Sequence, residues 1–162
     1  MAVPLAPAGA RFEEGRCQVL VEIEPRPRCG TVTVPERWST GLGRIELAVM
    51  VLPSPNQAPA PDAVAYLGGG PGAFTLASVP AFQSQLDVLR ERGDVIVFDQ
   101  RGSGLSTPAL ECPDIVSVTR SIEDDPTLTD HEVDKRVWGG LERCGQKLRS
   151  QGIDLGAFNT ID

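Results

Sequence analysis

The sequence predicts an α/β fold in which antiparallel strands come first and parallel strands joined by a crossover helix follow. Three extended segments rich in β-branched residues, separated by turn residues, lie between residues 18 and 52. Two short apolar runs, AVAYL at 63–67 and DVIVFD at 94–99, then flank a segment with helical periodicity. Strand, helix and strand in this order are typical of a parallel crossover unit.

The composition is that of one globular domain and limits the classes of partner. The chain has 162 residues, of which 41% are apolar, and its 17 Gly and 14 Pro indicate many turns. Its formal net charge of -7 repels the phosphates of nucleic acids and anionic lipid headgroups. The sequence contains no run of 18 apolar residues that could form a membrane-spanning helix. We therefore expect neither nucleic acid nor a membrane as a partner.

The first part of the chain, residues 1–62, is predicted to hold antiparallel strands at 18–23, 31–34 and 44–52. Thr40-Gly41-Leu42-Gly43 is the expected hairpin turn between the second and third strands. Residues 53–61 contain four prolines, which indicates an exposed connector rather than a strand or helix. The second part, residues 63–162, then holds the parallel units.

The strands at 63–67 and 94–99 are continuous apolar runs, which is typical of strands covered on both faces. Between them, four apolar residues recur at helical spacing. Ser78 is the expected N-cap of this helix, Pro80 fits its first turn and Gly93 its end. The four apolar residues are Val79, Phe82, Leu86 and Leu89.

A second helix is predicted over residues 130–150. Thr129 and Glu132 have the spacing of a capping box at its start. Gly139 and Gly140 are expected to weaken its middle, because glycine is a poor helix former. The apolar stripe of this helix consists of Val133, Val137, Leu141, Cys144 and Leu148.

The four cysteines fall into two local pairs, Cys17 with Cys29 and Cys112 with Cys144. Two disulfides would each constrain the unfolded chain by about 3 to 4 kcal/mol, and four buried thiols are the alternative. No CxxC spacing occurs, so a zinc site is not expected. The pairing favours an extracytoplasmic location. Residues 1–10 lack a secretion signal, which favours the cytoplasm, so the location stays open.

Two glycine-containing loops follow the two apolar strands. Leu67-Gly68-Gly69-Gly70-Pro71-Gly72 exposes backbone amides that could bind a phosphate or a transient oxyanion, and a tight turn is the structural alternative. The second loop, residues 99–106, has the sequence DQRGSGLS. Asp99 and Arg101 in this loop could pair with each other and with loop amides, and a structural brace is the more common role for such a pair.

Taken together, GGGPG and DQRGSGLS resemble two motifs, HGGPG or AGGPG and DQRGxGxS, of one α/β-hydrolase family. This family includes prolyl and tripeptidyl aminopeptidases. The segment CGTVTVP at 29–35 is similar to the family's CGxLxVP segment, and residues 44–52 resemble its next strand. Cys112 and Cys144 match positions where members place a cysteine pair. The resemblance covers almost the whole chain from Cys17 onward, although position 68 is Gly where many members have His or Ala.

The resemblance implies a role for each loop in a serine hydrolase. Gly69 and Gly70 would help to form the oxyanion hole, which binds the negative charge of the transition state. Pro71 and Gly72 would fix the shape of this first loop. The residues that would hold the second loop beneath the nucleophile are Asp99, Arg101, Gly102, Gly104 and Ser106.

The catalytic triad of such an enzyme cannot be assembled from this sequence. A serine hydrolase needs a nucleophilic Ser on a GxSxG turn, followed by an acid and a His. Ser106 has Pro at the fifth position of that pattern, and Ser103 lies inside the second loop. His131, the single histidine, lies in a charged segment where a solvated surface role is expected. We therefore expect an inactive N-terminal portion of an α/β-hydrolase domain that ends before the nucleophile.

The topology of this family implies that the strand at 63–67 forms an open sheet edge here. An apolar edge recruits another chain or aggregates, so a complementing C-terminal polypeptide is an expected partner. The complete enzyme would act on a peptide, or on a small ester or amide, and most closely resembles an aminopeptidase. No cofactor and no metal are expected.

Two other interpretations stay open at this point. Gly68, Gly70 and Ala73 fit the GxGxxA pattern of a nucleotide-binding loop, with Asp99 at the end of the next strand. Pro71 interrupts the helix start that such a loop requires, and the second loop has no role in it. A non-catalytic interaction protein that retains part of a hydrolase sequence is the other alternative.

Overall fold

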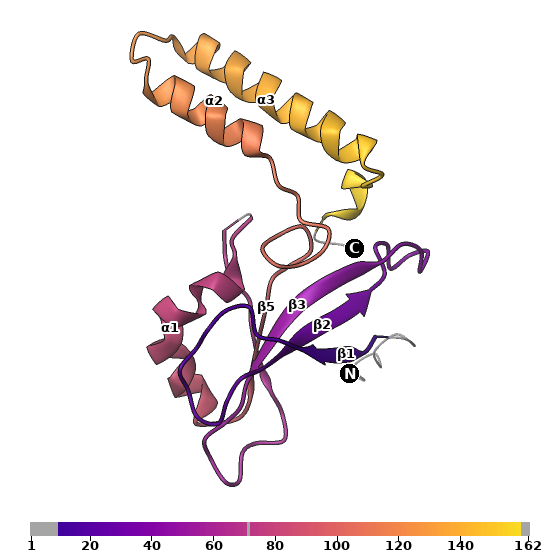
Figure 1. Ribbon diagram of the computed structural model, residues 1–162, viewed down its shortest axis with the longest axis vertical. Coiled ribbons are helices and arrows are strands. Elements are labelled where there is room, and N and C mark those ends of the chain that lie inside the picture. The colour runs from indigo at the N-terminus through magenta and orange to yellow at the C-terminus, as the bar shows by residue number, and fades with distance from the viewer. Residues whose placement is uncertain (1–9, 71, 160–162) are drawn as a thin grey trace. The chain divides into compact units, whose positions relative to one another are not determined.

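The computed structural model describes residues 10–70 and 72–159 of the chain. These residues form two compact units, which divide between Ala109 and Leu110. The first unit contains the sheet and one helix, and the second is helical (Figure 1). Among the described residues, no helix is both long and apolar enough to cross a bilayer.

The first unit is built on a mixed sheet with the strand order β1-β2-β3-β5-β4. The pairs β1–β2, β2–β3 and β3–β5 are antiparallel, and the pair β5–β4 is parallel. The structure therefore confirms the predicted α/β fold with antiparallel strands before parallel ones. The strands are β1 (Phe12–Gly15), β2 (Arg28–Val34), β3 (Ile45–Leu52), β4 (Val64–Tyr66) and β5 (Val95–Phe98).

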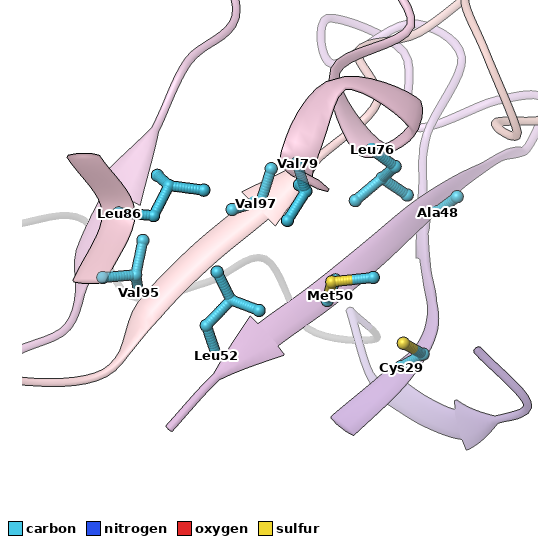
Figure 2. Packing of buried hydrophobic residues seen from close by; sticks show 9 residues of the cluster. All are labelled: Cys29, Ala48, Met50, Leu52, Leu76, Val79, Leu86, Val95 and Val97. Carbon is cyan, nitrogen blue, oxygen red and sulfur yellow. The ribbon is translucent and has the colours of Figure 1, made fainter. Parts of the chain in front are cut away.

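The core of this unit lies between one face of the sheet and helix α1 (Thr75–Arg90), as Figure 2 shows. Met50 on β3 lies opposite Val97 on β5, and Leu52 lies opposite Val95, so these four side chains share one face. All four are almost completely buried, and burial of each stabilises the fold by about 1.5 to 3 kcal/mol. From α1, this face is covered by Leu76, Val79 and Leu86.

The first predicted strand, residues 18–23, is not a strand in the structure. β1 occupies the edge of β2 instead, and β3 occupies the other edge, so β2 offers no further pairing partner. The disulfide between Cys17 and Cys29 turns the chain back directly after β1. Residues 18–27 then form a loop whose Val19, Val21 and Ile23 side chains pack against the core. Apolar burial explains the β-branched residues there without a strand.

Helix α1 begins earlier than predicted. Its N-cap is Phe74, and the Ser78 hydroxyl donates to the Phe74 carbonyl instead of capping the helix. Pro80 lies inside the helix and not in its first turn, and the helix ends at Arg90, before Gly93. The prediction from the local sequence therefore placed the start of α1 too late. The group that accepts a hydrogen bond from the first turn comes from another part of the chain.

The two apolar strands β4 and β5 are covered on one face only within this unit. Val95 and Val97 are fully buried toward α1, whereas Ile96 and Phe98 on the opposite face are partly exposed. Ala65 in the middle of β4 is exposed. The prediction of two covered faces was therefore wrong for the described residues.

The second unit is a helical hairpin made of α2 (Pro113–Glu123) and α3 (Asp130–Ser150), followed by a short 3₁₀ helix, η1 (Leu155–Ala157). The bounds of α3 and its Thr129–Glu132 capping box confirm the prediction. Gly140, which was predicted to weaken the middle of α3, is needed there for packing. A Cβ at this position would lie only 2.9 Å from Cδ1 of Ile115. Glycine at this position lets α2 approach α3 closely (Figure 1). α2 was not predicted, although its Ile115, Val118 and Ile122 have helical spacing.

Both predicted disulfides are present. Cys17 and Cys29 have Cα atoms 5.0 Å apart and join the start of the 18–27 loop to β2. Cys112 and Cys144 have Cα atoms 5.6 Å apart and join the start of α2 to α3. Each bridge therefore stays within one compact unit.

Candidate functional site

The glycine loop leaves the carboxyl end of β4, at the edge of the sheet. Gly70 and Gly72 have φ angles of 91° and 74°, which favour glycine, and Pro71 between them lies outside the described residues. Gly69 and Gly70 are exposed. Within residues 10–70 and 72–159, neither of their N–H groups donates to another group of the protein. Two backbone donors are therefore available to a ligand at this point.

Gly68 at the start of the loop packs against the first residue of α1. A Cβ at Gly68 would collide with the side chain of Thr75, which is buried. The His or Ala that many members of the resembled family carry here would therefore require Thr75 to move. Gly69 differs, because a Cβ added there meets no atom within 4 Å among those described.

Asp99 at the end of β5 connects α1 to the second loop. Its carboxylate is fully buried, and Oδ1 accepts a hydrogen bond of 2.9 Å from the Leu76 N–H in the first turn of α1. Oδ2 accepts a bond of 2.8 Å from the Leu105 N–H. Asp99 therefore supplies the helix cap that the local sequence lacks, and both of its oxygens have structural partners.

Gly102 and Gly104 allow the second loop to fold around Asp99. Their φ angles are 78° and 57°, in the left-handed region. A Cβ at Gly104 would collide with Oδ2 of Asp99. Glycine is required at position 104 both by the backbone conformation and by the closeness of this carboxylate.

The serine hydroxyls of this loop are used internally. Ser106 is buried, donates to the Asp99 carbonyl at 2.6 Å and accepts from the Ala48 N–H at 3.0 Å, which ties the loop to β3. The Ser103 hydroxyl donates to the Gln100 carbonyl at 3.0 Å. Both hydroxyls thus stabilise the conformation of the loop.

Two further side chains of the second loop reach neighbouring segments. Arg101 donates through Nη1 to the Glu36 carbonyl at 2.9 Å, in the segment that follows β2. Gln100 donates through Nε2 to the Gly68 carbonyl at 3.1 Å and so joins the two glycine-containing loops. The sequence alone did not single out Gln100. The only signal was its position inside the DQRGxGxS pattern.

His131 lies in the first turn of α3, in the second unit, and its side chain is exposed. The two acidic residues of this unit whose pKa is lowered, Asp125 and Glu132, lie at the surface too. Hydrogen bonds from Thr129 lower the pKa of Glu132, and hydrogen bonds from Thr127 lower the pKa of Asp125. These contacts stabilise the turn before α3 and the start of that helix. In the part of the chain that the structure describes, no group of three or more His, Cys, Asp or Glu residues is arranged to hold a metal ion.

One surface hollow of the first unit is formed by the segment between β1 and β2. It has a volume of about 670 Å³ and is lined only by residues of the segment 17–27. Cys17 is the one candidate residue from the sequence among those that line this hollow, and it is held in a disulfide. The chemistry of the first unit is therefore concentrated at the two loops and not in this hollow.

Comparison with known proteins supports a relationship to hydrolases. No family model matches the chain. Over 89 residues it is 39% identical to "Carboxylesterase B" of Mycobacterium tuberculosis and to "Putative hydrolase Mb2247c" of Mycobacterium bovis, which covers 52% of the chain and 16% of each relative. It is 32% identical over 96 residues to "Putative hydrolase YuaR" of Escherichia coli, covering 54% of the chain and 19% of that protein. The chain thus corresponds to less than a fifth of the length of these relatives, and over half of its own length it is similar to proteins named as hydrolases.

Proposed function

We propose that this chain is the N-terminal portion of a serine hydrolase of the α/β-hydrolase family and supplies part of its oxyanion hole. The observation that carries the proposal is the pair of exposed N–H groups at Gly69 and Gly70, which have no partner within the described residues. They follow a strand at the sheet edge, beside a loop braced by Asp99. In acyl transfer, such donors bind the oxygen on which negative charge develops.

A transient oxyanion fits this loop better than a bound nucleotide phosphate. A phosphate would be attracted to the free N–H groups at the start of α1. The Leu76 N–H there is already bonded to the buried Asp99 carboxylate. A phosphate at the same helix end would meet a like charge, which disfavours it. This contact argues against the nucleotide-binding alternative.

The chain is proposed to be inactive alone. A serine nucleophile must be accessible and must lie beside a general base. The hydroxyls of Ser103 and Ser106 both donate to carbonyl groups inside the second loop. The nucleophile, the acid and the catalytic His are therefore proposed to come from the part of the enzyme that this chain does not contain.

The same missing part is the proposed partner of β4. β4 pairs with β5 on one side only and forms the end of the described sheet. An additional parallel strand there would place the residue after the nucleophile beside Gly69 and Gly70. Its N–H would complete the oxyanion hole.

The substrate is proposed to be an acyl compound with an ester or peptide bond, because both are cleaved through the same tetrahedral intermediate. The motif resemblance favours an aminopeptidase, whereas the names of the relatives favour a carboxylesterase. Two chromogenic substrates, p-nitrophenyl acetate and an aminoacyl p-nitroanilide, separate these specificities. Turnover of the anilide with a free amino group supports the aminopeptidase.

The test compares the chain alone with the chain assembled with the polypeptide region that carries the missing triad. We expect turnover only in the assembly, and a fluorophosphonate probe should label a serine outside this chain. Gly69→Pro removes the N–H and should lower kcat about 10²–10³-fold. Gly69→Ala keeps the N–H, so its loss should be much smaller. Unaided turnover, or labelling of Ser103 or Ser106, contradicts the proposal.

A further inference from the structure

We propose that Gln100 is a positioning residue for the oxyanion hole: its side-chain amide holds the Gly68–Gly69 peptide so that the Gly69 N–H faces the reacting carbonyl. This inference rests on the proposed function. It gives a role to a side chain that bridges the two loops and that neither the fold nor the triad chemistry otherwise requires.

The geometry of one peptide bond carries the argument. Gln100 Nε2 donates to the Gly68 carbonyl oxygen at 3.1 Å. Among the described residues, the cis peptides are Glu24–Pro25 and Thr107–Pro108, so the Gly68–Gly69 peptide is trans. In a trans peptide, the C=O and the N–H that follows it point to opposite sides of the chain. A bond that fixes the Gly68 carbonyl therefore also fixes the direction of the Gly69 N–H.

The glycine loop needs such an anchor. Glycine populates a wide range of backbone angles, so a peptide between two glycines rotates more readily than others. Gly69 is exposed, and no described atom lies within 4 Å of the point where its Cβ would be. Neighbouring side chains therefore do not hold this peptide plane. A donor that stabilises a transition state must be oriented before the reaction.

Gln100 is itself held firmly at its backbone. Its carbonyl accepts hydrogen bonds from both the N–H and the hydroxyl of Ser103, at 3.1 and 3.0 Å. The preceding residue, Asp99, is fixed through both carboxylate oxygens. The exposed side chain of Gln100 thus extends from a rigid base to a flexible peptide. This is the arrangement expected of a supporting residue.

The alternative is that the bond only adds stability. The side chain of Gln100 is exposed, so water can replace this hydrogen bond and a purely structural role would change folding little. An orienting role would change the chemical step instead. The split between kcat and KM separates these roles, because a group that acts through the transition state lowers kcat.

The experiment uses the assembled enzyme with Gln100→Met, which keeps the side-chain length and removes the donor. We expect kcat for p-nitrophenyl acetate to fall about tenfold, less than for loss of a whole donor, with KM nearly constant. Binding of a boronic acid that mimics the tetrahedral intermediate should weaken by the same factor. Gln100→Lys, which retains a donor, should keep more activity. Gln57→Met in the exposed connector is the matched control and should leave kcat unchanged.

A second measurement does not depend on activity. In glycine-labelled protein, Gln100→Met should move the amide resonance of Gly69 and leave that of Gly41 in place. Equal kcat and equal inhibitor binding in an active assembly overturn the positioning role and leave the proposed function standing. An inactive wild-type assembly overturns the proposed function. In that case the Gly69 resonance still decides whether Gln100 orients the peptide.

Discussion

The buried carboxylate of Asp99 accepts a 2.9 Å hydrogen bond from the backbone N–H of Leu76, which joins the end of β5 to the first turn of α1. The first N–H groups of a helix have no partner within the helix, and a carboxylate there also interacts favourably with the helix dipole. Because the other carboxylate oxygen binds Leu105, one side chain fixes both the helix start and the second loop.

Replacement of Asp99 should therefore destabilise the first unit. Asp99→Asn leaves one acceptor oxygen for two N–H donors, so one buried donor loses its partner. We expect a loss of about 1–3 kcal/mol, measured as a lower urea midpoint with an unchanged m-value. Asp62→Asn, at an exposed site in the same unit, should stay within about 0.5 kcal/mol of the parent chain. Equal midpoints for the two variants would contradict the bracing role.

Gly41 and Gly104 have similar backbone angles, so alanine substitutions at the two positions distinguish the cost of backbone strain from the cost of a steric clash. Gly41 and Gly104 have φ angles of 67° and 57°, but only Gly104 lacks room for a Cβ, because the Asp99 carboxylate is there. Gly41→Ala should cost about 1–2 kcal/mol from the left-handed conformation alone. Gly104→Ala should cost clearly more, measured by the same denaturation. A smaller loss at Gly104 than at Gly41 would show that the second loop relaxes freely.

The edge at β4 should control self-association of the isolated chain. The Val64 N–H donates to the Asp94 carbonyl at 2.8 Å, so in a parallel ladder the backbone groups of the next residue, Ala65, face away from β5. Ala65→Pro removes the N–H at this open edge, where proline is tolerated. In size-exclusion chromatography with light scattering, the parent chain should form larger species as concentration rises, and Ala65→Pro should form fewer.

Gln57→Pro, in the exposed connector, is the control for this edge and should behave as the parent chain. Addition of a complementing polypeptide should also suppress self-association of the parent. A stable parent monomer with cooperative unfolding would rule out edge pairing as a property of this chain.

The capping box of α3 should respond to acid. The Glu132 carboxylate accepts hydrogen bonds from the Thr129 N–H and hydroxyl, which lower the pKa of Glu132 in the folded state. A lowered folded-state pKa means that this contribution to helix stability is present above the unfolded-state pKa. It is lost as the pH falls through the folded-state value. The protection factors of amides in the first turn of α3, which compare the observed exchange rate with the intrinsic rate at each pH, should therefore fall on acidification.

Thr129→Val provides the comparison for this titration. It removes the hydroxyl, so the pKa of Glu132 measured by NMR should move back toward the ordinary glutamate value. Protection factors near the end of α3 should change much less in both proteins. An unchanged Glu132 pKa in Thr129→Val would show that the hydroxyl does not stabilise the ionised carboxylate.

Elements with strong local signals were predicted well. α3 has both its cap and its apolar stripe within one continuous segment, and its observed bounds are the predicted ones. β3, β4 and β5 lie within their predicted ranges, and β2 contains its predicted range but begins three residues earlier. Short β-branched runs between turn residues carry this information locally. The local cysteine pairs also matched the observed disulfides.

Errors arose where a distant group decided the local structure. The apolar residues from Val19 to Ile23 have the composition of a strand, but they form a loop on the core because β2 already pairs with β1 and β3. Ser78 has the identity of an N-cap, but Asp99, 23 residues from Leu76, satisfies the helix start. Residue type shows what a segment can do, and the available partners decide which possibility is realised.

In the candidate site too, some features were evident from the local sequence and others depended on distant partners. From the sequence by itself came the two glycine-containing loops, their order after two strands, and the lack of an assignable serine triad. Only the tertiary structure brought Gln100 to the Gly68 carbonyl and turned the Ser106 hydroxyl inward. Motif spacing is a local property, whereas the direction of a backbone N–H depends on hydrogen bonds between segments that are distant in sequence.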